Sequence, residues 1–130
     1  MVIEGYPIIF NEVDFQNDIM SPDLIIVGDM PKMLLEHAQP KICKWIEISR
    51  DDRGYKIIGE VVNQWVVRSI KHRWRSGLSI GFRTLAASYD HELKVRRVQC
   101  IELLEVSIVA TPAVPGAHLK VTHPHWLATA

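Results

Sequence analysis

The chain has 130 residues, with 15 basic and 15 acidic side chains. Its hydrophobic share of 48% and charged share of 23% are ordinary for a globular protein, and the length fits one packed core, so we expect a single domain over residues 1–130. A net charge of zero gives no electrostatic argument for nucleic acid or an anionic membrane, and no apolar run approaches the roughly 20 residues of a membrane helix. We therefore expect neither as a partner.

Two cysteines, Cys43 and Cys100, are too few for a disulfide framework and favour a reducing compartment. The opening residues carry no basic leader, so we expect no signal peptide. Both observations indicate an intracellular protein.

The first 40 residues predict short extended pieces. Residues 2–10 are rich in β-branched and aromatic side chains and indicate a strand, whereas the Asn-, Asp- and Pro-containing segment 11–23 predicts a loop. The apolar run 24–37 is interrupted by Gly28 and Pro31, which predicts two short extended pieces.

A hairpin and a helix follow. Residues 41–50 and 55–62 are strand-like, and Gly54 between them can supply the positive φ of a tight turn. In segment 63–77 apolar residues recur every four positions, which predicts a helix with Asn63 as N-cap and Gly77 just past its end. The apolar positions are Val66, Ile70 and Trp74, and the basic ones are Arg68, Lys71, Arg73 and Arg75. The basic residues form either a solvated face or a surface for an acidic partner.

Residues 78–87 and 95–112 predict two strands joined by a polar turn, and a last short strand or helix and a tail, about 118–130, complete the chain. The pattern predicts an α+β fold that is mostly β with helices, in the form of a small closed or partly open barrel.

A lone serine in the first of these strands suggests chemistry. Alternation points Leu78, Ile80 and Phe82 to one face and both Ser79 and Gly81 to the other. A hydroxyl beside a residue without a side chain suits a nucleophile that a substrate must approach closely. The alternative is an ordinary serine on a strand face.

A serine nucleophile needs a base, and the chain has six histidines. His37 is the candidate because it ends an apolar run, although a surface or core histidine is the alternative. His123 and His125 have no third ligand nearby, so we expect no metal and no cofactor.

Glu105 is the candidate acid. It lies within an apolar strand, where a carboxylate needs a partner such as an imidazole N–H. Alternation places it with Ser107, opposite Leu104 and Val106. The alternative is a strand glutamate that faces solvent or pairs with Arg96 or Arg97.

Five segments in order resemble the prohead (capsid maturation) serine proteases of tailed phages, which are related to the herpesvirus assemblin-type proteases. These segments are 5–23, 34–45, 51–61, 76–82 and 102–117. The resemblance implies an assemblin-like barrel flanked by helices, with Ser79 as nucleophile, His37 as general base and Glu105 as the orienting acid. Gly81, Arg83, Arg96 and Arg97 are candidates for the oxyanion or substrate-binding site.

The resemblance also implies a task. Such an enzyme cuts scaffolding protein, or the scaffold-like N-terminal segment of the major capsid protein, inside the immature capsid in the bacterial cytoplasm. It often cuts itself and works as a homo-oligomer, a dimer or higher. Cys43 departs from the family, which tends to have glycine there.

Two other functions stay open. The chain could be an inactive protease-fold scaffold or assembly partner, for which a wide separation of Ser79 and His37 would be evidence. Cys43 could also be the nucleophile, with His37 six residues away.

Overall fold

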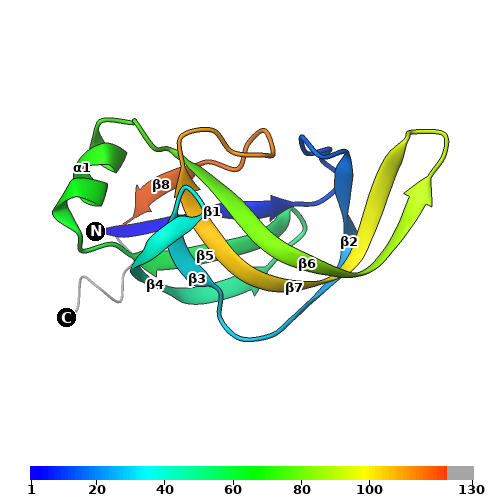
Figure 1. Ribbon diagram of the computed structural model, residues 1–130, viewed down its shortest axis with the longest axis horizontal. Helices are drawn as coiled ribbons and strands as arrows, with labels where there is room; N and C mark the ends of the chain where they lie inside the picture. Colours follow the sequence, from blue (N-terminus) through cyan, green and yellow to red (C-terminus); the bar gives the residue numbers. More distant parts are fainter. Residues whose placement is uncertain (123–130) are drawn as a thin grey trace.

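The computed structural model describes residues 1–122, apart from the side chains of residues 39–43. This part forms eight strands and one helix (Figure 1): β1 (Val2–Ile9), β2 (Asp18–Val27), β3 (Lys32–Leu35), β4 (Ala38–Arg50), β5 (Gly54–Glu60), α1 (Gln64–Lys71), β6 (Gly77–Asp90), β7 (Val95–Val109) and β8 (Leu119–Thr122). The mostly β character and the predicted hairpin, which is β4–β5, are confirmed. The positive φ predicted for Gly54 is not observed; this glycine instead lies against β1, where a methyl group would be 1.9 Å from the Ile8 carbonyl oxygen.

The sheet is organised around β7. Its whole length pairs antiparallel with β6 along one edge, and β2 and β3 pair with it in parallel along the other. From β3 the order continues by antiparallel pairing through β4, β5 and β1 to β8. Strand β7 therefore connects all parts of the sheet.

The predicted barrel and its flanking helices are not confirmed. The strand order has two ends, β2 and β8. Within residues 1–122, the start of β6 meets the segment before β8 through an isolated bridge between Gly77 and His118 and a hydrogen bond from the Leu78 N–H to Ala117 O at 2.8 Å. Closure fails because β8 is only four residues long and pairs with β1, while β6 runs on along β7. In the same residues α1 is the one helix, and it lies at the end of the molecule opposite the tip of the β6–β7 hairpin (Figure 1).

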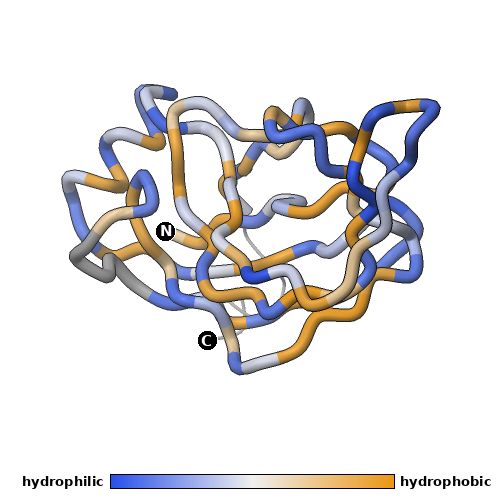
Figure 2. Tube along the Cα trace, turned by 45° about the vertical axis from the view of Figure 1, so that its right-hand side comes forward, coloured by the Kyte–Doolittle hydropathy of each residue, from blue (hydrophilic) through white to orange (hydrophobic). Residues whose placement is uncertain are grey.

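Strands from all parts of the sheet contribute to one apolar core. Figure 2 shows hydrophobic stretches along the strands and hydrophilic residues at most of the turns. Burying a large aliphatic side chain contributes about 1.5–3 kcal/mol. The most deeply buried side chains include Ile3, Ile8, Leu24, Met33, Ile57, Val66, Leu78, Ile101, Val106 and Ile108.

Helix α1 begins as predicted and ends earlier. The Asn63 carboxamide oxygen accepts hydrogen bonds from the backbone N–H groups of Trp65 and Val66, at 3.0 and 3.1 Å. The predicted apolar stripe does not reach Trp74, because Arg73 adopts a positive φ of 58° and stops the helix before it. The Trp74 side chain is 57% exposed and stacks on His72. None of the helical segments in the described part is long and apolar enough to cross a membrane.

One segment differs from the sequence prediction. The predicted loop 11–23 contains the start of β2, which begins at Asp18 and is held by parallel pairing with β7. Its partner lies far away in the chain, so local composition does not reveal this strand. At the other end, the predicted last short element is a strand, because residues 119–122 form β8, paired with β1.

Candidate active site

The β6–β7 pairing gathers four residues on one face of the sheet. Ser79 lies directly opposite Ser107, and Gly81 opposite Glu105. Side chains directly opposite in an antiparallel pair share a face, as do residues two apart on one strand. Ser79 and Ser107 are both buried.

A β-bulge follows this patch. Gly81 and Phe82 are consecutive on β6 but pair with Glu105 and Leu103, so Leu104 has no partner opposite. The extra residue turns Leu103 into the core, at 3% exposure, and leaves Leu104 50% exposed. The prediction that Leu104 shares the core face of Val106 is therefore wrong. Bulges often occur beside active sites, where they redirect side chains.

His37 lies on a two-residue turn between β3 and β4. Leu35 pairs with Ala38 across it, and both central residues, Glu36 and His37, have positive φ, 51° and 63°. The sequence did not predict this turn because such positions usually carry Asn or Gly. Other residues pay about 1–2 kcal/mol each for this conformation.

Several hydrogen bonds hold the strained turn. The Glu36 backbone N–H donates to Ile108 O at 3.1 Å, and the Glu36 carboxylate accepts from Arg75 Nε and the Ala110 N–H, each at 3.1 Å. The His37 backbone N–H donates to Ser107 Oγ at 3.1 Å. The end of β7 thus fixes a backbone conformation that the local sequence does not favour.

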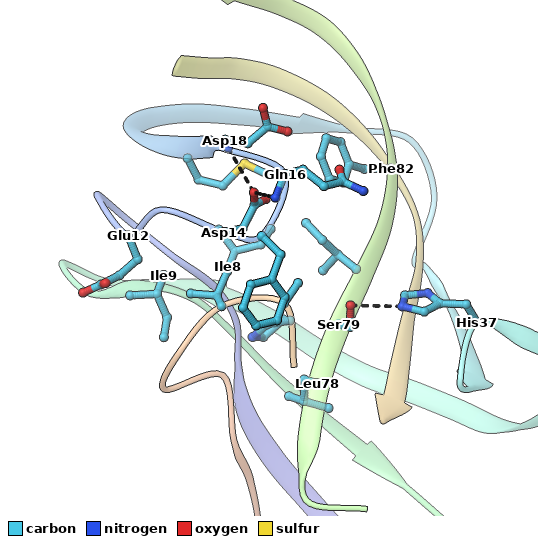
Figure 3. Close-up of a pocket in the computed structure, with 16 residues that line it drawn as sticks. Ile8, Ile9, Glu12, Asp14, Gln16, Asp18, His37, Leu78, Ser79 and Phe82 are labelled. Atoms are coloured by element: carbon cyan, nitrogen blue, oxygen red, sulfur yellow. Dashed lines mark hydrogen bonds between the residues drawn. The ribbon is translucent and has the colours of Figure 1, made fainter. Parts of the chain in front are cut away.

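This turn brings the imidazole between the hydroxyl and the carboxylate. His37 Nε2 lies 3.0 Å from Ser79 Oγ (Figure 3), and Nδ1 is hydrogen-bonded to Glu105 Oε1. The carboxylate favours the tautomer with its proton on Nδ1, which leaves Nε2 free to accept the serine proton. The three predicted residues come together in the geometry of a Ser-His-acid set.

Two neighbours complete the arrangement. A methyl group on Gly81 would lie 2.5 Å from Glu105 Cγ and 2.6 Å from Oε1, so this glycine makes room for the carboxylate. Ser107 Oγ donates to the other carboxylate oxygen, Oε2, at 3.1 Å. Sequence reasoning assigned no role to Ser107, although its place two residues after Glu105 on a strand already put both on one face.

A cavity of about 430 Å³ opens beside Ser79 (Figure 3). Its walls come from the end of β1, the loop after it, β6 and residues 113–114, and they are mostly apolar, including Ile8, Phe15, Leu78 and Val114. Glu12 and Asp14 are among its acidic lining residues. The cavity is an apolar recess with Ser79 among its lining residues.

A family model described as caudovirus prohead serine protease matches residues 1–127. The chain belongs to this family. The family resemblance predicted from five segments is thereby confirmed. No curated protein matches the sequence.

Solved structures of similar fold come from the herpesvirus KSHV. Its protease in complex with a hexapeptide phosphonate inhibitor has a TM-score of 0.63 and 15% identity, over 98% of this chain and 68% of that one. A second KSHV protease structure has a TM-score of 0.56 and 14% identity, over 98% of this chain and 64% of that one. A third, in complex with an allosteric inhibitor, has a TM-score of 0.55 and 17% identity, over 98% and 80% of the two chains. The prohead protease chain thus shares the assemblin fold.

Three arginines predicted near the site have other partners in this prohead protease. Arg83 pairs with Glu102 at 2.9 Å, and Arg97 with Asp90 at 3.2 Å. Arg96 forms a two-pronged pair with Asp18, 2.9 Å for each bond, and this carboxylate raises the pKa of Arg96.

Their positions along the strands separate them from Ser79. Arg97 lies opposite Ser88, nine residues beyond Ser79 on β6 (88 − 79), or roughly 30 Å along a strand. Arg96 lies one residue further along this pairing, and Arg83 is four residues from Ser79 with a 67% exposed side chain. Of the four candidate oxyanion or substrate-binding residues, Gly81 is the one that lies beside the Ser-His-Glu set.

The sequence predicted that His123 and His125 hold no metal ion, and the structure does not test this prediction. His123 and His125 lie outside the described residues, as does the side chain of Cys43. Within the described part, acidic, cysteine and histidine side chains form no cluster of three or more that could hold a metal ion.

Proposed function

We propose that this member of the prohead protease family is an active serine endopeptidase with Ser79 as nucleophile, His37 as general base and Glu105 as orienting acid. The observation that carries the proposal is the 3.0 Å contact between Ser79 Oγ and His37 Nε2. It is within the hydrogen-bond reach that proton abstraction requires.

The geometry supports acyl transfer in two stages. As Ser79 Oγ bonds to the carbonyl carbon of the scissile peptide, its proton moves to His37 Nε2 and the carbonyl oxygen takes up the electron pair. When the C–N bond breaks, Nε2–H gives the proton to the leaving amine. Water then repeats the sequence at the acyl-enzyme, which releases the new carboxyl terminus and restores Ser79.

Glu105 supports both stages by stabilising the imidazolium that forms on His37. Its side chain is 13% exposed, whereas the His37 side chain is 42% exposed. A shielded carboxylate next to an accessible imidazole suits an orienting role, because water competes little for its oxygens while the base still reaches substrate.

The family suggests the substrate. We propose that the enzyme cuts scaffolding protein or the N-terminal scaffold-like segment of the major capsid protein, inside the immature capsid in the bacterial cytoplasm. Cleavage of its own chain and assembly into a homo-oligomer belong to the same proposal. The apolar cavity beside Ser79 provides the binding surface for the peptide.

An inactive assembly partner remains the competing function, and the contact between Ser79 and His37 speaks against it. We therefore test activity directly, by co-expressing the chain with the capsid protein encoded in the same gene cluster and reading the intact mass of the capsid product. We expect truncation with the wild type and none with Ser79→Ala, a loss of at least about 1,000-fold.

The matched control is Ser88→Ala, which changes an exposed serine on the same strand. It should cut like the wild type. Truncation that persists with Ser79→Ala would refute Ser79 as nucleophile, and no truncation with any form would support the inactive assembly partner.

A further inference from the structure

We propose that Ser107 is a positioning residue that fixes the His37–Glu105 pair, an inference that rests on the proposed serine protease function. Ser107 is fully buried on β7, directly opposite Ser79. The Ser107 hydroxyl is hydrogen-bonded to the His37 backbone N–H and to Glu105, and not to the Ser79 hydroxyl. Any effect of Ser107 on the reaction therefore passes through His37 and Glu105.

The direction of each hydrogen bond at Ser107 is determined by its partner. The His37 backbone N–H can only donate, so Ser107 Oγ accepts from it at 3.1 Å. An ionised carboxylate can only accept, so the hydroxyl proton points to Glu105 Oε2 at 3.1 Å. The hydroxyl has one proton, and the structure uses it to orient Glu105.

This bond completes the fixation of the carboxylate. Oε1 of Glu105 is hydrogen-bonded to the imidazole and Oε2 to Ser107, so both oxygens are engaged and rotation of the group breaks at least one bond. Without the hydroxyl, Oε2 has no such anchor, and the carboxylate can turn away from Nδ1.

The same oxygen also fixes the backbone that carries the imidazole. His37 has a positive φ, and its N–H bond to Ser107 is one of the contacts that hold the turn. One buried atom thus sets the position of the imidazole relative to the carboxylate. Glu36 anchors the other side of the turn through Arg75 and Ala110, so the turn has support that does not depend on Ser107.

A purely structural role for Ser107 makes a different prediction. A buried hydroxyl with two partners stabilises the fold by about 1–3 kcal/mol, and its loss would lower stability while folded molecules keep their reactivity. A positioning role lowers the reactivity of Ser79 in molecules that are folded. The two roles are therefore separated by measurements on the folded fraction.

The experiment compares Ser107→Ala and Ser107→Cys with Ser107→Thr. Alanine removes the hydroxyl, cysteine keeps a side chain there with only a weak donor, and threonine keeps the hydroxyl. The first readout is the rate at which a fluorophosphonate probe labels Ser79, measured by intact mass. The second is the downfield NMR resonance of the His37 Nδ1 proton in ¹⁵N-histidine-labelled protein, with thermal unfolding to verify folding.

We expect labelling of folded Ser107→Ala and Ser107→Cys to be slower by about 10- to 100-fold, by analogy with the loss of hydrogen-bond partners that orient metal-ligating histidines and carboxylates. The Nδ1 proton resonance should broaden or disappear in both, and Ser107→Thr should restore both readouts. Ser88→Ala should match the wild type. If alanine fails to fold, the cysteine variant decides by the same readouts.

Wild-type rates and an unchanged resonance in the folded alanine or cysteine variant would overturn the inference. Failure of the proposed function looks different, because then the wild type itself is not labelled at Ser79. In that case the Nδ1 resonance alone decides whether Ser107 orders the His37–Glu105 pair.

Discussion

The β6–β7 hairpin has two halves that differ in what they do. In the inner half, residues 77–81 and 105–109, Ser79 lies opposite Ser107 and Gly81 opposite Glu105. His37 is hydrogen-bonded to Ser79, Glu105 and Ser107, and Ser107 also donates to Glu105. In the outer half, residues 82–90 and 95–103, the polar contacts are ion pairs, and Leu85 and Tyr89 are 49% and 55% exposed. One ladder thus carries a site at one end and an extended arm at the other (Figure 1).

The difference shows what makes a site of a strand pair. Polar groups in the inner half are shielded and have several fixed partners, so each hydrogen bond restricts the geometry of the next. Charges in the outer half are accessible to water, which weakens their attraction and leaves them little effect beyond local order. Arg83 and Arg97 belong to this second class, whereas Arg96 forms a bidentate pair with the buried carboxylate of Asp18.

Among the variants that leave Ser79, His37 and Glu105 unchanged and compare the two halves, the largest expected effect is that of Gly81→Ala. The new methyl group would overlap Glu105 Cγ, at 2.5 Å, and displace the carboxylate from His37. A displacement of about 1 Å at a catalytic group can cost about 100-fold in rate, so we expect a fall of that order in the cleavage rate of folded enzyme. The measurement is the rate of capsid protein cleavage per folded molecule.

Its control is Gly59→Ala, where a methyl group would lie 2.4 Å from Trp45 and 2.7 Å from Met33 in the core. Both variants should lose about 1–3 kcal/mol of stability through overpacking. Only Gly81→Ala should lower the cleavage rate per folded molecule. An equal fall in this rate for Gly59→Ala would mean that the contact of Gly81 with Glu105 has no particular effect on activity.

An intermediate effect is expected at the tip of the hairpin in acid. Asp90 accepts from the N–H of Leu93 and from Arg97, and these donors hold the pKa of its carboxyl below the ordinary value of 3.8. Because the folded value is below the unfolded one, the carboxylate stabilises the tip above pH 3.8, and this contribution is lost as the pH falls through the folded pKa.

Amide hydrogen exchange, corrected for its intrinsic pH dependence, measures this loss. Amides at the tip, residues 88–97, should lose protection as the pH falls below 3.8, while those of Ile80 and Val106 keep theirs. Asp90→Asn should remove the pH dependence at the tip. Earlier loss of protection in the inner half than at the tip would reverse the comparison.

The smallest effect is expected for Arg97→Gln. The Arg97–Asp90 pair is partly exposed, and such pairs contribute little that can be measured. Neither the thermal midpoint nor the cleavage rate should change beyond experimental error. A clear fall in the cleavage rate without unfolding would return Arg97 to the site, as the sequence had suggested.

Much of the site could be predicted before the fold was known. Alternation put Ser79 and Gly81 on one face of a strand. A serine nucleophile requires a base and an orienting acid, and the family resemblance implied His37 and Glu105 for these roles. The close approach of Gly81 to the Glu105 side chain was not predicted, and its expected oxyanion or substrate-binding role stays a prediction. Alternation placed Ser107 on the same face as Glu105, but its role was missed because its second partner, the His37 backbone N–H, is 70 residues away in the chain.

The sequence by itself determined the features that depend on near neighbours: the β4–β5 hairpin, the Asn63 cap, and the alternation along β6. The tertiary structure decided the contacts between residues far apart in the chain. His37 is 42 residues from Ser79, 68 from Glu105 and 70 from Ser107.

The physical reason is the range of the forces that each feature depends on. Backbone sterics and local hydrogen bonds act over a few residues, and the sequence displays them directly. The positive φ of Glu36 and His37, the bulge at Leu104 and the choice of partner for each arginine are imposed by strands that pack from elsewhere. Only when β3 and β6 both pair with β7 do the hydroxyl, imidazole and carboxylate meet.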